Sequence, residues 1–368
     1  MSTNFSETSA RALAEKAISN QTAISTQEII DSGIVPELKG FTVMPGKVSD
    51  SIFGGLGSYT DKNGKNVEFE NPHLKNTNGD HVRILIRTEQ ISTHDINRGS
   101  IPFKDQILSL NHNFMRQLVA PFMPHAQLLI GSSDTDIVSF ALNVNRFPIE
   151  NVVRAYLAKT TTSTSLYQQY CIEGKKEYCG IALYYYENEL RVNERLPFVM
   201  DTPSTKSSEH DQSVAPEKLF KVGLFDGQHY RSIRNNSLVA FGVVSGYLRQ
   251  RGIILVDTKT EHGVDEDGKI WAIDELYTMD SSRYWKMKND GTILTDAKGE
   301  PVSFSKEFAR GISKGADGYT DQQRVNIAVR YMEGIELLTG KSFTPDLLPW
   351  HERVVNQLHK GVASLRFT

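Results

Sequence analysis

Charged residues gather in one stretch that otherwise has the pattern of two apolar β-strands joined by a turn. The stretch Leu255–Trp285 reads LVDTKTEHGVDEDGKIWAIDELYTMDSSRYW. Its charged side chains include Asp257, Lys259, Glu261, Asp274 and Arg283. Burying a charge costs free energy unless the charge is paired, holds a metal ion or contacts a ligand. This hairpin therefore constrains the fold and a functional site together.

The first strand of this hairpin carries a polar stripe. Alternate residues of a strand share a face, so Asp257, Lys259 and Glu261 are expected to project together. Asp274 on the return strand shares that face if the paired residue numbers have an odd sum. Carboxylates beside one lysine suit Mg²⁺ and a polyphosphate. Spacing alone slightly favours the alternative, a solvated face with cross-strand ion pairs.

Length and charge limit the classes of protein. The chain has 368 residues, 39% of them hydrophobic and 23% charged, which is more than one compact domain usually holds, so two lobes are expected. The formal net charge of -3 shows no basic excess. This argues against a nucleic-acid binder that relies on phosphate contacts, but it is compatible with a local basic pocket for a small phosphorylated ligand.

Cysteine usage and the N-terminus indicate a compartment. The chain has two cysteines, Cys171 and Cys179, which is too few for disulfides to stabilise a protein of this size, so a reducing cytoplasm fits best. A disulfide between these two cysteines is a minor alternative. The first residues lack the apolar core of a signal peptide, and no run approaches the ~18 apolar residues of a membrane span. A cytoplasmic protein without a membrane partner is expected.

The pattern along the chain predicts an α+β fold. Helices are expected from Ser6 to Ser19 and from Ser25, which has capping-box spacing with Glu28. Strands with a hairpin turn at Gly64 follow, and residues 196–215 have the composition of a loop. Helical patterns occupy residues 217–251, where Gly223, Gly227, Gly242 and Gly246 indicate breaks, and residues 305–310, 320–338 and 347–365. A β-rich first lobe and helices around a sheet in the second are typical of the α+β class.

The hairpin resembles the signature of the SAICAR synthetase (phosphoribosylaminoimidazole-succinocarboxamide synthase) family, VD-x-K-x-E-x-G followed by DE-x-x-x-PD-S-S-R-x-W. Other blocks match in the family's order. VMPGKVSD resembles GKVRD, RTEQISTHDINRGSIPFKDQILSLN resembles DRISAFD and IPGKG, VVRAYLAKTTTSTSLYQQY resembles VVRGYITGSxWxxY, TPSTKSSEHD resembles TPSTKAExHD, and YMEGIELLTGKSF resembles YxExYExITGKxF. Co-linear blocks from Gly46 to Phe343 are more specific than any single one.

The resemblance implies an activity and a set of site residues. The family uses ATP and Mg²⁺ to join the carboxylate of carboxyaminoimidazole ribotide (CAIR) to the amine of L-aspartate through an acyl phosphate, giving SAICAR, ADP and phosphate in purine biosynthesis. By resemblance the metal-linked carboxylates are Glu261 and Asp274. The catalytic residues are Asp95, Asp257 and Lys259, and the sequence leaves open whether Asp95 or Asp257 accepts the ammonium proton of aspartate. The ATP contacts are Lys47, Lys206 and Asp211. The residues that hold the ribotide phosphate or the aspartate carboxylates are Arg154, Ser165 and Arg283.

The resemblance also implies an architecture and partners. It predicts a two-lobed SAICAR synthetase-like fold with a helical extension at residues 1–40, a β-rich nucleotide-binding lobe at residues 41–148, and a larger C-terminal lobe at residues 149–368 that carries the metal and substrate site. The ATP cleft is expected between the lobes. The expected partners are the small molecules CAIR and L-aspartate, without nucleic acid, and a homo-oligomer is compatible with the sequence.

The match has departures, and two other functions remain open. Ser49 stands where the family has a basic residue, Met279 replaces a proline, and residues 159–163 form an insertion. The first alternative is a small-molecule kinase, because an Asp-x-Lys pair in a nucleotide cleft also serves phosphoryl transfer to a hydroxyl. The second is a non-catalytic nucleotide sensor. The complete set of acidic residues in the hairpin weighs against the sensor.

Overall fold

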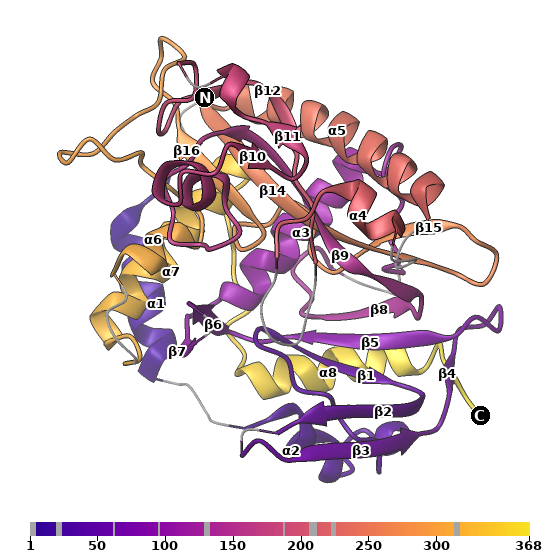
Figure 1. The fold of residues 1–368 in the computed structure, drawn as a ribbon. Helices are drawn as coiled ribbons and strands as arrows, with labels where there is room; N and C mark the ends of the chain where they lie inside the picture. Colours follow the sequence, from indigo (N-terminus) through magenta and orange to yellow (C-terminus); the bar gives the residue numbers. More distant parts are fainter. Residues whose placement is uncertain are drawn as a thin grey trace. The chain divides into compact units, whose positions relative to one another are not determined.

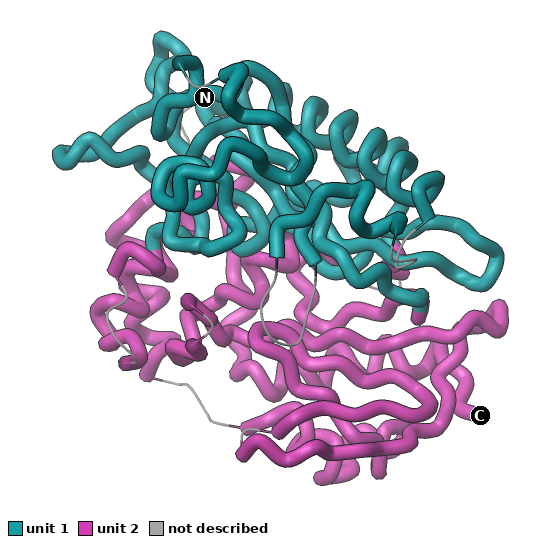
Figure 2. The backbone as a smooth tube through the Cα atoms, in the orientation of Figure 1, with its two compact units in different colours: residues 1, 111–125, 144–308 teal, residues 2–110, 126–143, 309–368 magenta. Residues whose placement is uncertain are grey.

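In the computed structural model the chain folds into two compact units. The structure describes residues 5–19, 24–61, 63–94, 96–128, 133–186, 188–205, 212–221, 226–312 and 317–368. Unit 1 comprises residues 111–125 and 144–308, and unit 2 comprises residues 2–110, 126–143 and 309–368 (Figure 2). The expected α+β class is confirmed by the mixture of sheets and helices.

An antiparallel six-stranded sheet forms the centre of unit 1. Its strand order is β12-β9-β14-β15, with β13 paired to β9 and β16 paired to β14. Helix α5 lies along one face of this sheet (Figure 1). The strands are β9 (Asn145–Tyr156), β12 (Arg195–Asp201), β13 (Ser204–Thr205), β14 (Ile253–Val264), β15 (Ile270–Ile273) and β16 (Ser282–Lys286). The remaining elements are η2 (Tyr167–Ile172), β10 (Glu177–Tyr178), β11 (Ile181–Ala182), η3 (Tyr184–Tyr186), α4 (Pro216–Lys221) and α5 (Gly227–Arg249).

Local sequence explains the two longest elements of unit 1. Strand β14 starts with four consecutive buried apolar residues, Ile253 to Val256, which suits a strand covered on both faces. Helix α5 starts at Asp226, whose side chain accepts a hydrogen bond from the backbone N–H of Gln228 at 2.8 Å. Its buried residues recur every three or four positions, so one stripe of the helix covers the sheet.

Unit 2 combines a small sheet, three two-stranded pairs and several helices. The sheet order is β1-β5-β8, and the pairs are β2-β3, β6-β7 and β4-β17. The strands are β1 (Ser49–Phe53), β2 (Gly55–Thr60), β3 (Asn66–Asn71), β4 (Leu74–Lys75), β5 (Val82–Arg87), β6 (Gln90–Thr93), β7 (Ile96–Ser100), β8 (Val138–Leu142) and β17 (Arg366–Phe367). The helices are α1 (Glu7–Ser19), α2 (Thr26–Asp31), η1 (Pro36–Leu38), α7 (Asp321–Thr339) and α8 (Trp350–Val362). The division between the units falls within α3 (Lys104–Val119) and α6 (Glu307–Ile312).

The last helix completes the core of unit 2. Val354, Leu358 and Val362 recur at every fourth position of α8 and are buried in one cluster with Ile52 and Ile84 of the sheet. Helix α1 packs on α7 in the same unit. The sequence placed residues 309–368 with the C-terminal lobe, whereas the structure packs them with the N-terminal strands. Each compact unit is therefore built from segments that are not consecutive in the sequence.

Several local predictions are confirmed. Ser25 and Glu28 form the expected capping box at α2, and helix α1 occupies the first predicted segment. Gly64 lies in the β2–β3 turn with a φ of 80°, a value that glycine adopts without steric cost. Cys171 and Cys179 are free thiols, so the disulfide alternative is wrong.

Other local predictions are wrong. Residues 196–215 were expected to be loop, but Arg195–Asp201 form β12 and pair with β9. Gly242 and Gly246 were expected to break a helix, but they lie inside α5, because the surrounding stripe of buried residues offsets the cost of glycine.

Among the described helices none is long and apolar enough to cross a membrane.

Candidate active site

Two arginines and one aspartate form a buried cluster across three neighbouring strands of unit 1. Asp257 on β14 lies opposite Arg154 on β9 and opposite Arg283 on β16. Arg154 donates from Nη1 to Asp257 Oδ2 at 2.8 Å. Arg283 donates from Nε to Asp257 Oδ1 at 2.9 Å, and its Nη2 lies 2.7 Å from Oδ2. We call Arg154, Asp257 and Arg283 the arginine cluster.

The arginine cluster carries an unbalanced positive charge. Two guanidinium groups share one carboxylate, and the Arg154 and Asp257 side chains are only 7% and 8% exposed. Burial works against ionisation of Asp257, but Arg283 and Arg154 outweigh it and lower the pKa of the carboxyl group. Nη1 of Arg283 is buried and has no hydrogen-bond partner within the described part of the chain. A buried donor on an excess cation favours an anionic ligand.

A lysine held between two glutamates lies further along the same strands. Lys259 Nζ is 2.7 Å from Glu150 Oε1 and 3.2 Å from Glu261 Oε1. Glu150 and Glu261 are direct partners in the β9–β14 ladder, where two like charges repel unless a cation joins them. The contact between Lys259 and Glu261 confirms that these residues share a face of β14. We call Glu150, Lys259 and Glu261 the lysine cluster.

The lysine cluster has an excess of negative charge. Burial disfavours the ammonium of Lys259, but the carboxylates of Glu150, Glu261 and Asp274 outweigh burial and raise the pKa of Lys259. The Lys259 side chain is 35% exposed, so one side of it faces solvent. Glu261 Oε2 also lies 3.9 Å from Nη1 of a second cation, Arg146. The cluster is therefore anionic and accessible, the opposite of the arginine cluster.

Asp274 does not occupy the position expected from strand alternation. The observed register pairs Glu261 with Ile273, so the paired numbers have an even sum and the odd-sum condition is not met. Asp274 follows β15 with a φ of 60° and is exposed. The left-handed conformation removes Asp274 from the alternation of the strand. Its carboxylate nevertheless remains close enough to Lys259 to raise the pKa of that side chain.

Glu150 is the residue of this site that sequence analysis missed. It lies four residues before Arg154 on β9, so both share one face of the strand. The segment FPIENVVRAY therefore contains a glutamate and an arginine at strand spacing within an apolar run. This spacing is the signal that would have identified Glu150.

Ser165 is buried and already hydrogen-bonded. Its Oγ accepts a hydrogen bond from the Gln168 N–H at 3.1 Å, in the first turn leading into η2. The hydroxyl can still donate to a ligand, since accepting a bond does not use its proton.

Lys47 belongs to unit 2 and is exposed, in the turn that leads into β1. At Gly46 an added Cβ would lie 2.0 Å from the Ser49 carbonyl oxygen, so this turn requires glycine. Asp95, Lys206 and Asp211 lie outside the described residues. The structure thus brings together the predicted hairpin residues and Arg154, and leaves the other predictions as they were.

His262 is a buried neighbour of the site on β14. Burial lowers the pKa of its imidazole from an ordinary value of 6.5 to about 4, although Glu261 acts in the opposite direction. The folded protein therefore holds His262 in its neutral form at neutral pH. This supports a structural role rather than a ligand role for the histidine.

Acidification should destabilise the fold through His262. Between pH 6.5 and about 4 the unfolded chain binds a proton at this side chain and the folded chain does not, so the free energy of unfolding falls as pH falls, by about 3 kcal/mol in total. We expect His262→Gln to lack this contribution. Urea unfolding of both proteins at pH 7 and pH 4 measures it. Equal losses of stability in the two proteins would contradict the assignment.

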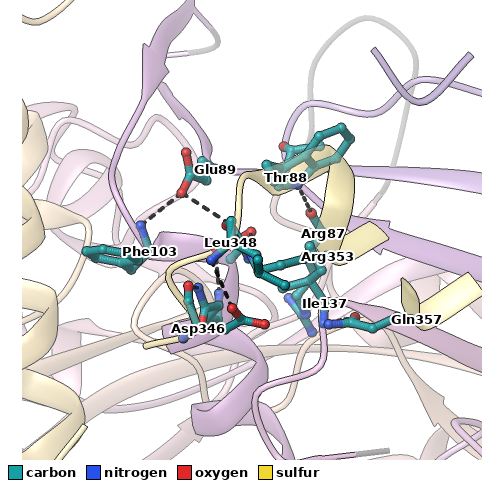
Figure 3. Close-up of polar contacts among 12 residues, drawn as sticks. Arg87, Thr88, Glu89, Phe103, Ile137, Asp346, Leu348, Arg353 and Gln357 are labelled. Carbon is teal, nitrogen blue, oxygen red and sulfur yellow. Dashed lines mark hydrogen bonds and ion pairs between the residues drawn. The ribbon is translucent and has the colours of Figure 1, made fainter. Parts of the chain in front are cut away.

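A cavity of about 730 Å³ lies in unit 2, next to α1, the start of β1 and the first turn of α8. At its wall Arg353 donates from Nε to the Leu348 carbonyl at 3.1 Å, and its Nη2 lies 3.6 Å from Glu89 Oε1 (Figure 3). Arg353 Nη1 also donates to Asp105 Oδ2 at 2.7 Å, so its charge is neutralised. None of the predicted site residues that the structure describes lines this cavity.

The carboxylates of the hairpin fit Mg²⁺ by their chemistry. Within the described ranges no group of three or more His, Cys, Asp or Glu side chains is arranged to hold a metal ion. Mg²⁺ in nucleotide sites is usually held by one or two carboxylates, with substrate phosphates and water supplying the remaining oxygens. The carboxylates of Glu261 and of the exposed Asp274 match that limited requirement.

Comparison with known sequences gives one consistent match. Residues 74–325 match the family model described as SAICAR synthetase. A phosphoribosylaminoimidazole-succinocarboxamide synthase of Legionella pneumophila (strain Paris) is 34% identical over 288 residues, covering 75% of this chain and 89% of that protein. The chloroplastic enzyme of the same name from Arabidopsis thaliana is 33% identical over 299 residues, covering 78% of this chain and 70% of that protein.

Solved structures of the same name share the fold. A structure named SAICAR synthase has a TM-score of 0.64 at 20% identity and covers 89% of this chain and 100% of its own. The Saccharomyces cerevisiae SAICAR synthase complexed with SAICAR has a TM-score of 0.63 at 20% identity, with coverages of 88% and 99%. A type-2 SAICAR synthetase in complex with ADP has a TM-score of 0.56 at 17% identity, with coverages of 83% and 100%.

Proposed function

Because this chain belongs to the SAICAR synthetase family, we propose that it is an ATP-dependent ligase that joins the carboxylate of CAIR to the amine of L-aspartate, giving SAICAR, ADP and phosphate. The observation that carries the proposal is the pair of oppositely charged clusters on β14. One cluster suits a phosphate or carboxylate, and the other suits a metal-bound nucleotide. The small-molecule kinase alternative is not favoured, since the relatives carry the name of the ligase.

We assign the arginine cluster to an anionic group of the substrates. Arg283 presents a buried Nη1 without a partner, and the cluster holds one more positive than negative charge. A planar guanidinium binds phosphate or carboxylate oxygens at two points, which a lysine does not. The phosphate of the ribotide satisfies both the charge and the geometry. Ser165 is proposed to add a hydroxyl donor to the same substrates.

We assign the lysine cluster to the nucleotide end of the reaction. Glu261 and Asp274 would hold Mg²⁺, which when bound offsets the negative charge of the ATP phosphates. Lys259 adds an ammonium group between Glu150 and Glu261. At ~3.3 Å per residue, Asp257 and Glu261 are roughly 13 Å apart along β14. That separation lets a ribotide place its phosphate at one cluster and its carboxylate toward the other.

The chemistry requires activation of the acid before the amine attacks. The CAIR carboxylate oxygen attacks the γ-phosphorus of ATP and ADP leaves, which gives an acyl phosphate. The amine nitrogen of aspartate then attacks the acyl carbon, phosphate leaves, and the nitrogen loses its proton. The enzyme contributes chiefly by positioning these groups and neutralising their charge.

Asp257 is poorly suited to accept the proton of the amine. Two guanidinium groups hold its carboxylate and lower its pKa, so it is a weak base. We therefore propose that Asp257 orients Arg154 and Arg283. Of the two alternatives, Asp95, which the family resemblance implies to lie near the CAIR carboxylate, is then the candidate base. Lys47, Lys206 and Asp211 are proposed, on the same resemblance, to contact ATP.

The compartment and the assembly also remain proposals. Two free cysteines in 368 residues agree with a reducing cytoplasm. Small-molecule substrates need neither nucleic acid nor a membrane, and a homo-oligomer stays compatible with the sequence.

One assay tests the function. Purified protein is incubated with ATP, Mg²⁺, CAIR and L-aspartate, and ADP and the succinocarboxamide product are followed as each component is omitted in turn. We expect product only from the complete mixture. Phosphorylation of a polyol or a ribotide hydroxyl without aspartate would instead favour a kinase.

The same assay tests the arginine cluster. We expect Arg283→Met to raise the KM for CAIR about 10- to 100-fold, because a charge-assisted hydrogen bond contributes roughly 1.5–3 kcal/mol. Arg195→Met is the matched control, since Arg195 is exposed on β12 of the same sheet. An unchanged KM in Arg283→Met would remove the arginine cluster from substrate binding.

A further inference from the structure

Thr202 is a buried hydroxyl at the end of β12 that contacts the arginine cluster directly. It is 1% exposed, and its Oγ1 accepts a hydrogen bond from Arg154 Nε at 3.0 Å. The same hydroxyl donates to the Val152 carbonyl at 2.9 Å. Because donation fixes the direction of the O–H bond, a lone pair of the oxygen is left for Arg154. The hydroxyl therefore has one defined orientation.

Arg154 is held at two points by two different elements. Nε donates to Thr202, and Nη1 donates to Asp257 Oδ2 at 2.8 Å. The guanidinium group is planar, so two anchored nitrogens fix the plane and its rotation. Besides these two hydrogen bonds, the Arg154 guanidinium interacts with the buried Tyr178 side chain, so Thr202 is one of the groups that restrict its rotation. The anchor at Thr202 therefore helps to set where the remaining N–H groups point.

The backbone that carries Thr202 is itself fixed. Its N–H donates to the Val152 carbonyl at 2.8 Å. The preceding Asp201 accepts hydrogen bonds from Asn151 Nδ2 at 2.6 Å and from the Tyr230 hydroxyl at 2.5 Å. These contacts tie the end of β12 to β9 and α5. Because these hydrogen bonds hold the backbone at the end of β12, the Thr202 hydroxyl has a fixed position.

We propose that Thr202 is a positioning residue for Arg154, and that its hydroxyl orients the guanidinium group toward the anionic group of the substrate. The inference rests on the proposed role of Arg154 in substrate binding. Thr202 acts through Arg154 and does not itself contact the substrate. The same hydroxyl also links Thr202, the first residue after β12, to the arginine cluster.

Two substitutions separate the hydroxyl from the shape of the side chain. Thr202→Val keeps the volume and removes the hydrogen bonds, and Thr202→Ser keeps the hydroxyl. We expect Thr202→Val to raise the KM for CAIR about 10-fold, to leave the KM for ATP within about 2-fold, and to change kcat less than KM. Thr202→Ser is expected to remain within about 3-fold of wild type in all three constants.

A control distinguishes positioning from loss of stability. Thr339 is a buried threonine in unit 2 whose Oγ1 donates to the Ile335 carbonyl at 2.7 Å, without an arginine partner. Both Thr202→Val and Thr339→Val are expected to lower the unfolding temperature, since each removes a buried hydrogen bond, but Thr339→Val should leave the KM for CAIR unchanged. A rise in KM in both valine variants would overturn the proposal, because it would trace the effect to stability.

Further outcomes separate this inference from the proposed function. If Arg154→Ala leaves the KM for CAIR unchanged, the binding role of Arg154 fails. If Arg154→Ala raises that KM and folded Thr202→Val does not, only the positioning role fails. An equal rise in the KM for CAIR in Thr202→Val and Thr202→Ser would also overturn the positioning role.

A measurement on the wild-type protein covers the case in which Thr202→Val does not fold. The ¹⁵Nε–H resonance of Arg154, assigned by its absence in Arg154→Lys, should exchange slowly with solvent because its proton is bonded to a buried hydroxyl. Fast exchange, like that of an exposed arginine, would contradict the proposal.

Discussion

Glu261→Gln is expected to lower the kcat of the ligase reaction roughly 10²- to 10³-fold while leaving the free energy of unfolding within about 1 kcal/mol of wild type. The neutral amide no longer offers a charged oxygen to Mg²⁺, and losing one preorganised electrostatic group costs roughly 10²–10³ in kcat. The fold should tolerate the change because Lys259 keeps Glu150 at 2.7 Å, and because the repulsion between facing Glu150 and Glu261 disappears.

Steady-state assays and urea unfolding together check this result. Glu266→Gln is the matched control, since Glu266 is exposed in the turn of the same hairpin. That variant should retain full activity. Asp274→Asn should lose activity in the same way, because Asp274 is the second proposed metal carboxylate. Full turnover in purified Glu261→Gln would remove the metal role from the lysine cluster.

Asp257→Asn is expected to have the largest effect on stability. The substitution leaves Arg154 and Arg283 buried next to each other without their shared carboxylate. Breaking a buried ion pair by removing one partner costs about 3–5 kcal/mol. The carboxyl group has a lowered pKa in the folded protein, so its contribution is present at neutral pH and is lost only on strong acidification.

Urea unfolding at pH 7 measures the loss, with Asp290→Asn as the control. Asp290 is an exposed turn residue whose Oδ1 accepts a hydrogen bond from the backbone N–H of Thr292. The amide oxygen of asparagine can accept the same bond, so Asp290→Asn should cost little stability. The double variant Asp257→Asn, Arg283→Met should recover part of the stability, because it removes one of the two unpaired cations. A stable Asp257→Asn would show that bound anions or solvent already neutralise the arginines.

The fold class and the chemistry of the hairpin were predictable from sequence because they depend on local periodicity. Alternation placed Asp257, Lys259 and Glu261 on one face, and the pairing of Lys259 with Glu261 confirms it for these two. A capping box and a glycine turn were also read correctly at Ser25 and Gly64. Such features involve residues only a few positions apart.

Features that depend on long-range pairing were not predictable. The strand spacing with Arg154 marks Glu150 as a candidate, but its place beside Lys259 and Glu261 depends on β9 lying next to β14, which no local pattern specifies. The position of Asp274 depended on register, which a single sequence does not specify. Thr202 lies in a segment with the composition of a loop, and its role depends on a side chain 48 positions away.

The arrangement of unit 2 has a consequence for biosynthesis. Its core includes residues from Ile29 onward, yet it also needs Val354 and Leu358 of α8. Strands made early during translation therefore keep apolar faces uncovered until the ribosome has released α8. Unit 1 consists largely of residues 144–308 and can assemble first. Chaperone demand during synthesis should therefore be highest for the N-terminal strands.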